Sequence, residues 1–449
     1  MKKAQFKSKF GLIAATVGSA VGLGNIWRFP AEAQANGGGA FLIVYIICVF
    51  LLGIPVMVSE FAVGRGGASD AVGAFKNLGA KRPWWLVGGL GVLASYLILC
   101  FYMVVAGWTF EYLWQSITNG LYQGVTETNG GFQLKMGEYI ADGFNSSINN
   151  YIVLALNIGV LLAGVQKGIE RLSNILMPIL FLLLVAFCIV SCTLPKAAEG
   201  LEFFLRPDFS KITMGTILNA LGQAFFSLSL GMGILLTYSA YFPSSTILTR
   251  TAVTVALLDM LVAVLMGFII FPAVMSFNLG GETLEGATLV FVTLPEVFLR
   301  MPGTQIWSIL FFLLLLVAAV TSTISIAEVS ISFMQDRFKL SRLKAVLATM
   351  LPLAVFSTAC AYSQSGIEWL QIGGKSLFDA LDFFATNICL PVGSIFLCIY
   401  VGWFAPKGFM ESQLTNNGTV TSHVFNVVLF IIRFVAPVLI AWILISTFL

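Results

Sequence analysis

The chain has 449 residues, of which 58% are hydrophobic and 10% are charged, and its mean hydropathy is +0.93. Soluble domains carry about 25% charged residues, so this chain has too little polar surface to face water on all sides, and we expect a lipid-facing exterior. A net charge of +3 is too small to indicate nucleic-acid binding. The seven cysteines, odd in number and without regular spacing, argue against a disulfide framework.

Long apolar runs divide the chain into candidate membrane spans. A spanning helix needs about 20 largely apolar residues, and by that measure we predict an all-α polytopic membrane protein with eleven spans. Residues 119–149 form the longest predicted loop between spans, and residues 282–300 are too short a run to span, which favours a re-entrant or surface-lying helical loop. The predicted spans are 10–35, 39–64, 84–118, 150–166, 172–193, 213–242, 246–276, 303–338, 342–361, 376–404 and 425–448.

The distribution of lysine and arginine predicts the orientation. Most of these residues fall on one side of the membrane if the N-terminus is cytoplasmic, which the positive-inside rule favours, and eleven spans then place the C-terminus outside. The first apolar run follows four lysines, as a signal peptide would. It contains Asn25, Arg28 and Glu32, however, and lacks a convincing cleavage site, so we treat it as the first span of a cell-membrane protein.

The first and sixth predicted spans are interrupted by glycines. The first contains Gly18, Gly22 and Gly24 together with Asn25 and Arg28, although each Gly costs up to about 1 kcal/mol of helix propensity and an intramembrane charge costs more. The sixth repeats the pattern as Ser-Leu-Ser-Leu-Gly-Met-Gly from residue 227. Close packing by small residues would explain the glycines but not the Asn and Arg. Two interrupted spans at matching places in two halves predict an inverted-repeat transporter.

Such breaks have a specific chemistry. A break frees backbone carbonyls, which can coordinate a sodium ion, and it exposes N–H groups at a positive helix end, which attract a carboxylate. We find no phosphate-binding loop, metal motif or nucleophile elbow, so an enzyme is disfavoured and no organic cofactor is expected.

Several long motifs resemble the neurotransmitter:sodium symporter family. They are the segments 18–30, 36–41, 53–55, 167–171 and 225–233, which occur in the family's order over nearly the whole chain. The resemblance is strongest to the bacterial amino-acid branch typified by LeuT and MhsT. It implies a single transporter domain, residues 1–449, with the LeuT fold and spans 1 and 6 unwound at mid-membrane. Its two five-span inverted repeats would cover about 10–193 and 213–404, and the extra span about 425–448.

The resemblance also implies two sodium sites at the first break. The first ion would bind ligands from three spans and the substrate carboxylate; the second would bind carbonyls and the hydroxyls of span 8. Taken alone, those hydroxyls could equally bond back to their own helix. The first-site residues are Ala20, Asn25, Ser227 and Asp259, and the second-site residues are Gly18, Val21, Ala318, Thr321 and Ser322.

Asp259 is an acid within an apolar run. A lone buried carboxylate favours its protonated form, whereas a carboxylate beside sodium can stay ionised and neutralise the ion. LeuT-like relatives have Asn here, and chloride-dependent relatives use an anion nearby. We therefore predict that Asp259 makes transport chloride-independent.

The implied substrate site lies between the two breaks. Amine-transporting relatives carry an Asp at the position of Gly22, so its absence predicts a substrate with its own carboxylate. No side-chain charge is left over, and the flexible thioether of Met232 can repack around bulky groups, which together favour a neutral, hydrophobic amino acid. The predicted substrate residues are Ser19, Ala20, Gly22, Leu23, Gly24, Ile98, Tyr102, Phe226, Ser227, Ser229, Met232, Ser322 and Ile326.

Two gates complete the expected alternating-access machine. The outer gate would pair Arg28 with Asp382 above the substrate, and the inner gate would pair Lys3 with Asp336 beside Phe6 and Tyr241. Lys3 replaces the family's Arg, and a point charge without the guanidinium fork predicts a weaker inner latch.

Three further features carry expectations. In MhsT-like relatives, a spacing like that between Gly168 and Pro178 lets span 5 unwind. Glu60 matches a buried acid expected to support the break in span 1, and Glu328 is a second buried acid without an assigned role.

These features predict sodium-coupled import of neutral amino acids. Two alternatives stay open: a LeuT-fold carrier coupled to another ion, and a sensor that binds an amino acid without moving it. The sequence leaves the oligomeric state open.

Overall fold

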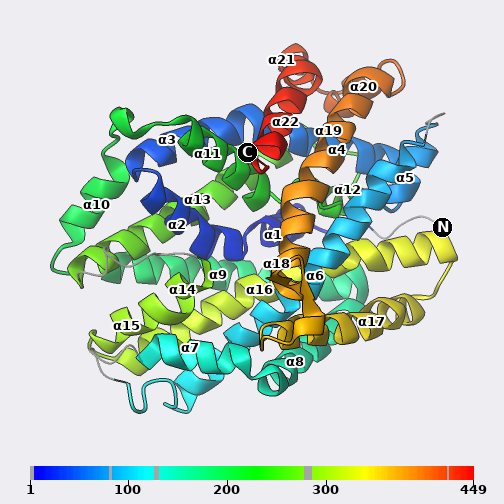
Figure 1. The fold of residues 1–449 in the computed structure, drawn as a ribbon. Helices are drawn as coiled ribbons and strands as arrows, with labels where there is room; N and C mark the ends of the chain where they lie inside the picture. Colours follow the sequence, from blue (N-terminus) through cyan, green and yellow to red (C-terminus); the bar gives the residue numbers. More distant parts are fainter. Residues whose placement is uncertain (1–4, 80–82, 126–130, 278–285, 422–423, 449) are drawn as a thin grey trace.

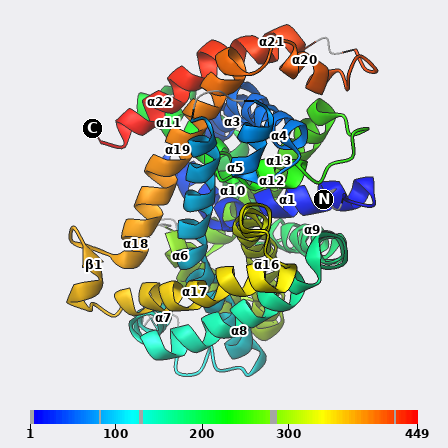
Figure 2. The ribbon, with the colours of Figure 1, turned by 90° about the vertical axis from the view of Figure 1, so that its right-hand side faces the viewer.

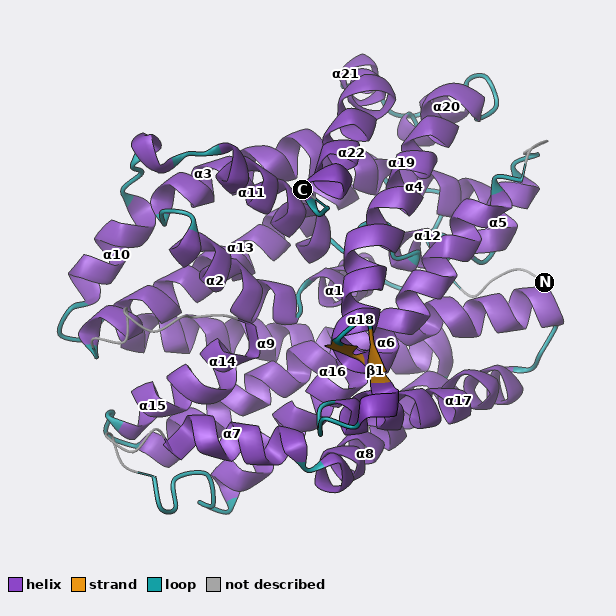
Figure 3. Cartoon of the chain, viewed as in Figure 1, coloured by secondary structure: helices purple, strands orange, loops and turns teal. Residues whose placement is uncertain are grey.

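The computed structural model describes residues 5–79, 83–125, 131–277, 286–421 and 424–448, and nearly all regular structure in it is helical (Figures 1 and 3). Within these residues, nine helices are long and apolar enough to cross a membrane, and one bent pair makes a tenth candidate span. The nine are Gly39–Gly67, Trp85–Ile117, Gly143–Leu162, Val165–Ser191, Leu248–Ser276, Thr304–Phe338, Arg342–Ser363, Leu377–Phe404 and Phe425–Ser446.

Several of these spans contain a π-helical turn. Val49–Gly53 joins α3 (Gly39–Cys48) to α4 (Ile54–Gly67), and Val165–Glu170 precedes α9 (Arg171–Ser191). The tenth predicted span consists of α18 (Leu377–Asp382), Phe383–Cys389, α19 (Leu390–Ile399) and Tyr400–Phe404, and the last consists of α21 (Phe425–Phe430), Ile431–Val435 and α22 (Ala436–Ser446). The uninterrupted helices are α6 (Trp85–Ile117), α8 (Gly143–Leu162), α13 (Leu248–Ser276), α16 (Thr304–Phe338) and α17 (Arg342–Ser363).

The two remaining predicted spans are broken. The first consists of α1 (Lys9–Ala20), then a π-helical turn, Gly24–Arg28, that continues into α2 (Phe29–Ala35), with a bend of 56°. The sixth consists of α11 (Met214–Ser227) and α12 (Ile234–Ser239), each too short to cross a membrane alone. Both interruptions fall where the sequence places its glycines.

The structure corrects some boundaries. The predicted loop 119–149 contains α7 (Gly131–Ala141), and α8 begins at Gly143 rather than at residue 150. Asp142 caps α8, since its carboxylate accepts hydrogen bonds from the amides of Phe144 and Asn145. The helix through Pro178 is continuous, so span 5 is not unwound here.

Short elements connect the spans. Residues 286–299 form α14 (Gly286–Thr288), a π-helical turn and α15 (Leu294–Leu299), and the buried ring of Phe291 packs edge-on against Tyr112, with ring centroids 4.8 Å apart. This loop therefore enters the bundle, as a re-entrant segment would. The others are α5 (Ala71–Asn77), α10 (Ala197–Leu205), the hairpin of β1 (Gln371–Ile372) and β2 (Lys375–Ser376), and α20 (Phe409–Leu414).

The middle of the bundle is formed by the longest helices. In Figure 2, α16 lies between α6 and α9, with α1 beside it. The side chains of α16 from Val317 to Ser332 are all buried, although seven of them are polar or charged, because they face the broken spans and neighbouring helices rather than lipid. A polar stripe inside an apolar bundle marks the place to examine for function.

Candidate functional site

The break in span 1 is held open by hydroxyl groups from other helices. After α1 ends at Ala20, the Ser322 hydroxyl of α16 donates a hydrogen bond to the Val21 carbonyl (3.2 Å), and the Ser229 hydroxyl donates to the Ser19 carbonyl (2.9 Å). The last carbonyls of an ended helix lose the amide partners of a continuing one. The break therefore gathers oxygen atoms at one place in the middle of the bundle.

The break in span 6 is built into the backbone. Ser229, Gly231 and Gly233 all have positive φ (54°, 78° and 72°) between α11 and α12. The Gly231 amide donates to a carboxylate oxygen of Glu60 at 2.7 Å. Sequence reasoning expected Glu60 to support the break in span 1, whereas the hydrogen bond that its side chain accepts comes from the break in span 6.

The predicted first-site residues converge on Asp259. One carboxylate oxygen accepts from the Asn25 side-chain amide at 2.9 Å, and the other accepts from the Ser227 hydroxyl at 2.9 Å. All three side chains are buried. Asp259 in α13 thus connects the start of the second half of span 1 to the end of α11.

Two neighbours of this cluster were missed by sequence reasoning. The Tyr45 hydroxyl lies 3.1 Å from the Ser227 hydroxyl, and the Gln223 side-chain amide donates to the Gly24 carbonyl at 2.9 Å. A signal existed for both, because Tyr45 places a hydroxyl within the apolar run of span 2 and Gln223 lies one helical turn before Ser227. Both side chains are buried and belong to the polar network around the breaks.

The predicted second-site residues also lie together. Beside the Ser322 bond to Val21, a Cβ added at Gly18 would lie 3.4 Å from the Thr321 Cβ, so α1 and α16 pack in direct contact here. The Thr321 hydroxyl donates to the carbonyls of Val317 and Ala318 in its own helix, each at 3.0 Å. Thr321 therefore makes the local bond that the alternative interpretation describes, whereas Ser322 bonds across to the break.

The predicted substrate residues surround the same breaks. The Leu23 amide donates to the Tyr102 hydroxyl of α6 at 3.1 Å. A Cβ added at Gly22 would lie 2.8 Å from the Ser322 Oγ and 2.9 Å from the Tyr102 Oη, and one at Gly24 would lie 2.9 Å from the Phe226 ring. Ile98, Met232 and Ile326 are buried. The glycines are thus required for the helices to approach this closely.

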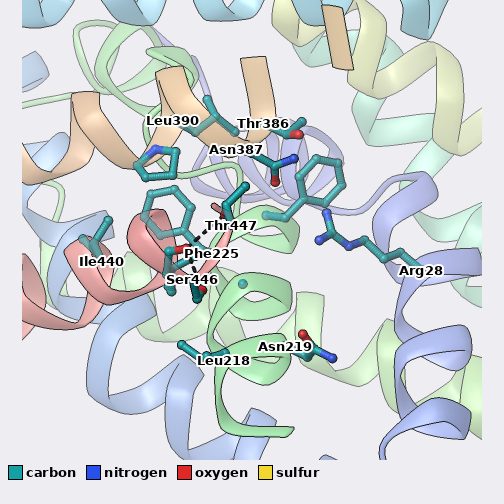
Figure 4. A pocket seen from close by; sticks show the side chains of 14 residues that line it. Arg28, Leu218, Asn219, Phe225, Thr386, Asn387, Leu390, Ile440, Ser446 and Thr447 are labelled. Carbon is teal, nitrogen blue, oxygen red and sulfur yellow. Dashed lines mark hydrogen bonds between the residues drawn. The ribbon is translucent and has the colours of Figure 1, made fainter. Parts of the chain in front are cut away.

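At the end of the bundle that is predicted to face outward, Arg28 and Asp382 do not form a direct ion pair. The Arg28 guanidinium instead lies 4.9 Å from the centre of the Phe226 ring and 3.9 Å from Glu32, its neighbour one turn along α2. Beside these side chains is a cavity of about 200 Å³ between α11, α19 and α22. Arg28 reaches it from one side, and Ile440, Ser446 and Thr447 face it from the end of α22 (Figure 4).

The end of the bundle that is predicted to face inward carries a denser network. Phe6 packs against Tyr238 and Tyr241, and its amide donates to the Tyr241 carbonyl at 3.1 Å. Asp336 accepts from the Asp70 amide at 2.8 Å and from the Ser69 hydroxyl at 3.2 Å. Lys3, its predicted partner, lies outside the described residues.

Glu328 has a clear partner. Its two carboxylate oxygens accept from the two terminal nitrogens of Arg342 at 2.9 and 2.7 Å, and one also accepts from the Tyr241 hydroxyl at 3.0 Å. A bidentate pair of this kind is geometrically specific. Glu328 therefore joins α16, the start of α17 and the inner aromatic cluster.

Comparison with known proteins agrees with this architecture. The family model described as the Sodium:neurotransmitter symporter family matches residues 3–132 and 125–449. An uncharacterized sodium-dependent transporter of Bacillus subtilis is 35% identical over 436 residues, covering 97% of this chain and 96% of that protein. Another from Methanocaldococcus jannaschii is 36% identical over 418 residues, covering 90% and 82%.

A solved structure supports the fold. The crystal structure of MhsT in complex with L-phenylalanine superimposes with a TM-score of 0.89 at 38% sequence identity and covers 99% of both chains. The predicted all-α LeuT fold is confirmed. The chain belongs to the sodium:neurotransmitter symporter family, and it is a multi-pass membrane transporter coupled to sodium, not an enzyme.

Proposed function

We propose that this transporter imports neutral, hydrophobic L-amino acids across the cell membrane with two sodium ions and without chloride. The observation that carries the proposal is the bonding of Asp259 to both broken spans, through Asn25 and Ser227. An ionised carboxylate at this place supplies the negative charge that would otherwise have to come from a bound anion. Sodium binding would then lock the two breaks together through one acid.

The second ion is proposed to bind where α16 meets the end of α1. The ligands would be the carbonyls of Gly18, Val21 and Ala318 and the hydroxyls of Thr321 and Ser322. The Ser322 hydroxyl already bonds to the Val21 carbonyl, and bound sodium would replace that proton as the group between the two oxygens. Hard oxygen ligands of this kind suit a hard cation.

The substrate class follows from the chemistry between the breaks. The Leu23 amide and the Tyr102 hydroxyl would bind the substrate carboxylate, while Ile98, Met232 and Ile326 offer apolar surface to its side chain. Gly22 adds no carboxylate for an amine, and any side chain there would collide with Tyr102 and Ser322. MhsT, the similar transporter of known structure, was crystallised with L-phenylalanine.

Alternating access would use the two ends of the bundle. Phe226 with Arg28 and Asp382 would close the outer side, and the aromatic cluster around Phe6 and Tyr241, with Lys3 and Asp336, would close the inner side. We propose that the N-terminus lies in the cytoplasm, as the lysine and arginine distribution predicts.

Uptake by the wild-type protein in proteoliposomes tests this function. Labelled L-phenylalanine should accumulate with an inward sodium gradient, not with choline or potassium, and should accumulate equally when gluconate replaces chloride. Uptake that is indifferent to sodium would favour a carrier coupled to another ion. Saturable binding to the purified protein without flux would instead identify a sensor, and strict dependence on chloride would contradict the assigned role of Asp259.

A further inference from the structure

A deep apolar groove lies on the outside of the bundle between α6 and α19. It has a volume of about 580 Å³, and its lining is almost entirely apolar. Its walls include Trp84, Leu86 and Leu93 from the α6 side and Phe396 from α19, and the last three side chains are about half exposed. In Figure 1 the two helices run beside one another at the centre of the view.

Two glycines make the groove. Gly89 in α6 has nothing within 4 Å of an added Cβ, so its missing side chain leaves open space at the surface. Gly393 in α19 forms part of the opposite wall, where an added Cβ would lie 3.7 Å from Leu90 and 3.8 Å from the Gly231 carbonyl. The groove therefore exists because these two positions lack side chains, between helices that otherwise pack closely.

The length of the groove fits one half of a bilayer. Its α6 lining runs from Trp84 to Leu93, and at 1.5 Å per residue this is about 14 Å of helix. The hydrocarbon core of a bilayer is about 30 Å thick, so one leaflet contributes about half of that. An extended acyl chain of one leaflet matches this length, whereas a transmembrane helix of a partner would continue past both ends.

A positive charge lies near one end of the groove, outside its lining. The Nζ of Lys76 in α5 is 5.0 Å from the centre of the Trp85 ring, and Trp85 stands in the chain between the lining residues Trp84 and Leu86. Trp rings at the end of a span are typical of the membrane–water interface, and an ammonium group at this level attracts an anionic headgroup.

The opposite side of the groove wall packs against the break in span 6. An added Cβ at Gly91 would lie 3.3 Å from the Gly233 Cα, and Gly393 is in contact with the Gly231 carbonyl. Only one layer of residues separates the groove from the break.

We propose that this groove binds one acyl chain of an anionic phospholipid, whose phosphate pairs with Lys76, and that the bound lipid braces the break in span 6 from outside. The site is distinct from the sodium and substrate sites, and it is carried by Gly89, Gly393 and Lys76. The proposal holds whichever amino acid is transported.

A matched pair of variants tests the groove. Gly89→Phe fills it without a backbone clash, and Gly159→Phe adds the same side chain at another exposed glycine, on α8, where an added Cβ also meets nothing within 4 Å. Native mass spectrometry of the purified full-length protein with added phosphatidylglycerol should show one retained lipid in the wild type and in Gly159→Phe, and none in Gly89→Phe. Equal retention in all three proteins would overturn the proposal.

A second measurement separates the headgroup from the acyl chain. Phosphatidylglycerol should raise the unfolding midpoint of the wild type more than phosphatidylcholine does. Lys76→Gln should reduce this difference between the two lipids by about fivefold. Equal effects of the two lipids on the wild type would contradict the role of Lys76. A dimer that disappears only in Gly89→Phe would show that a second copy of the chain, not lipid, occupies the groove.

Discussion

The two broken spans are opened in different ways. Around the break in span 1, Val21 and Leu23 have ordinary negative φ values (−67° and −60°), and hydroxyls from Ser322 and Ser229 keep the chain out of a continuous helix. In the break of span 6, three residues have positive φ, so the backbone itself leaves the helical conformation there. The first break is thus conditional on its contacts, and the second is fixed by the backbone.

This difference suggests a division of labour. The carbonyls at the break in span 1 accept hydrogen bonds from hydroxyl groups, and a sodium ion can take the place of such a proton. Span 1 therefore suits the moving, ion-sensing part of the transporter. A break held by backbone conformation, and by Glu60 at Gly231, keeps its shape through the cycle and suits a fixed substrate platform. Four substitutions test this comparison.

The largest effect is expected from Gly231→Ala. At φ 78° an added Cβ is strained, and it would lie 2.6 Å from both the Leu390 carbonyl and the Ser394 Oγ. The combined strain and overpacking should cost about 3 kcal/mol of unfolding free energy, measured from the unfolding midpoint in detergent. Gly408→Ala is the matched control, because Gly408 has φ 75° but open space around it, and about 1 kcal/mol is expected there. Similar losses for both would mean that strain at positive φ accounts for the whole effect, and that the close contacts with Leu390 and Ser394 add nothing to it.

Asp259→Asn should have the next largest effect, because this acid connects the two breaks. Loss of the carboxylate charge beside the ion should raise the sodium concentration for half-maximal uptake by about tenfold or more. Added chloride should then stimulate uptake in the variant but not in the wild type. Glu202→Gln, at an exposed acid in α10, serves as the control for a general charge effect. An Asn variant with unchanged sodium dependence would remove Asp259 from the first site.

Ser322→Ala addresses the conditional break. Loss of one hydroxyl ligand from the proposed second sodium site should weaken sodium binding by about 1 kcal/mol, so the sodium concentration for half-maximal uptake should rise by about fivefold. Thr323→Val is the control on the same helix, since the Thr323 hydroxyl bonds to Asn157 and Val320 and not to span 1. The control should lower the unfolding midpoint without changing the sodium dependence. The reverse pattern would place the ion-sensing contact elsewhere.

The sequence predicted the residues of the first sodium site better than the residues that hold them in place. Asn25, Ser227 and Asp259 were expected together because the family resemblance implies that they share a sodium site, and the structure brings them within hydrogen-bonding distance. Tyr45 and Gln223 were missed because their motifs carry no charge or break. Glu60 was assigned to span 1, although it bonds to span 6: linear order does not say which break an acid on a third helix will reach.

Element boundaries show the same limit. Hydropathy located most spans closely, yet α8 begins seven residues before its predicted start because Asp142 caps a first turn that is still polar. The ion pair between Glu328 and Arg342 depends on the turn between α16 and α17, which brings residues 14 positions apart face to face. Apolar periodicity contains no information about either contact.

Glu60→Gln should have the smallest effect, and it separates hydrogen bonding from charge in the fixed break. The Gln side chain keeps an acceptor for the Gly231 amide, so the loss of unfolding free energy should stay below about 1 kcal/mol. Glu60→Leu removes the acceptor and leaves a buried amide unpaired, for which about 1–3 kcal/mol is expected. The order of the two unfolding midpoints decides between the causes. If Gln is as damaging as Leu, the negative charge of Glu60, and not its bond to Gly231, holds the second break, and that break would then be as sensitive to its electrostatic surroundings as the first.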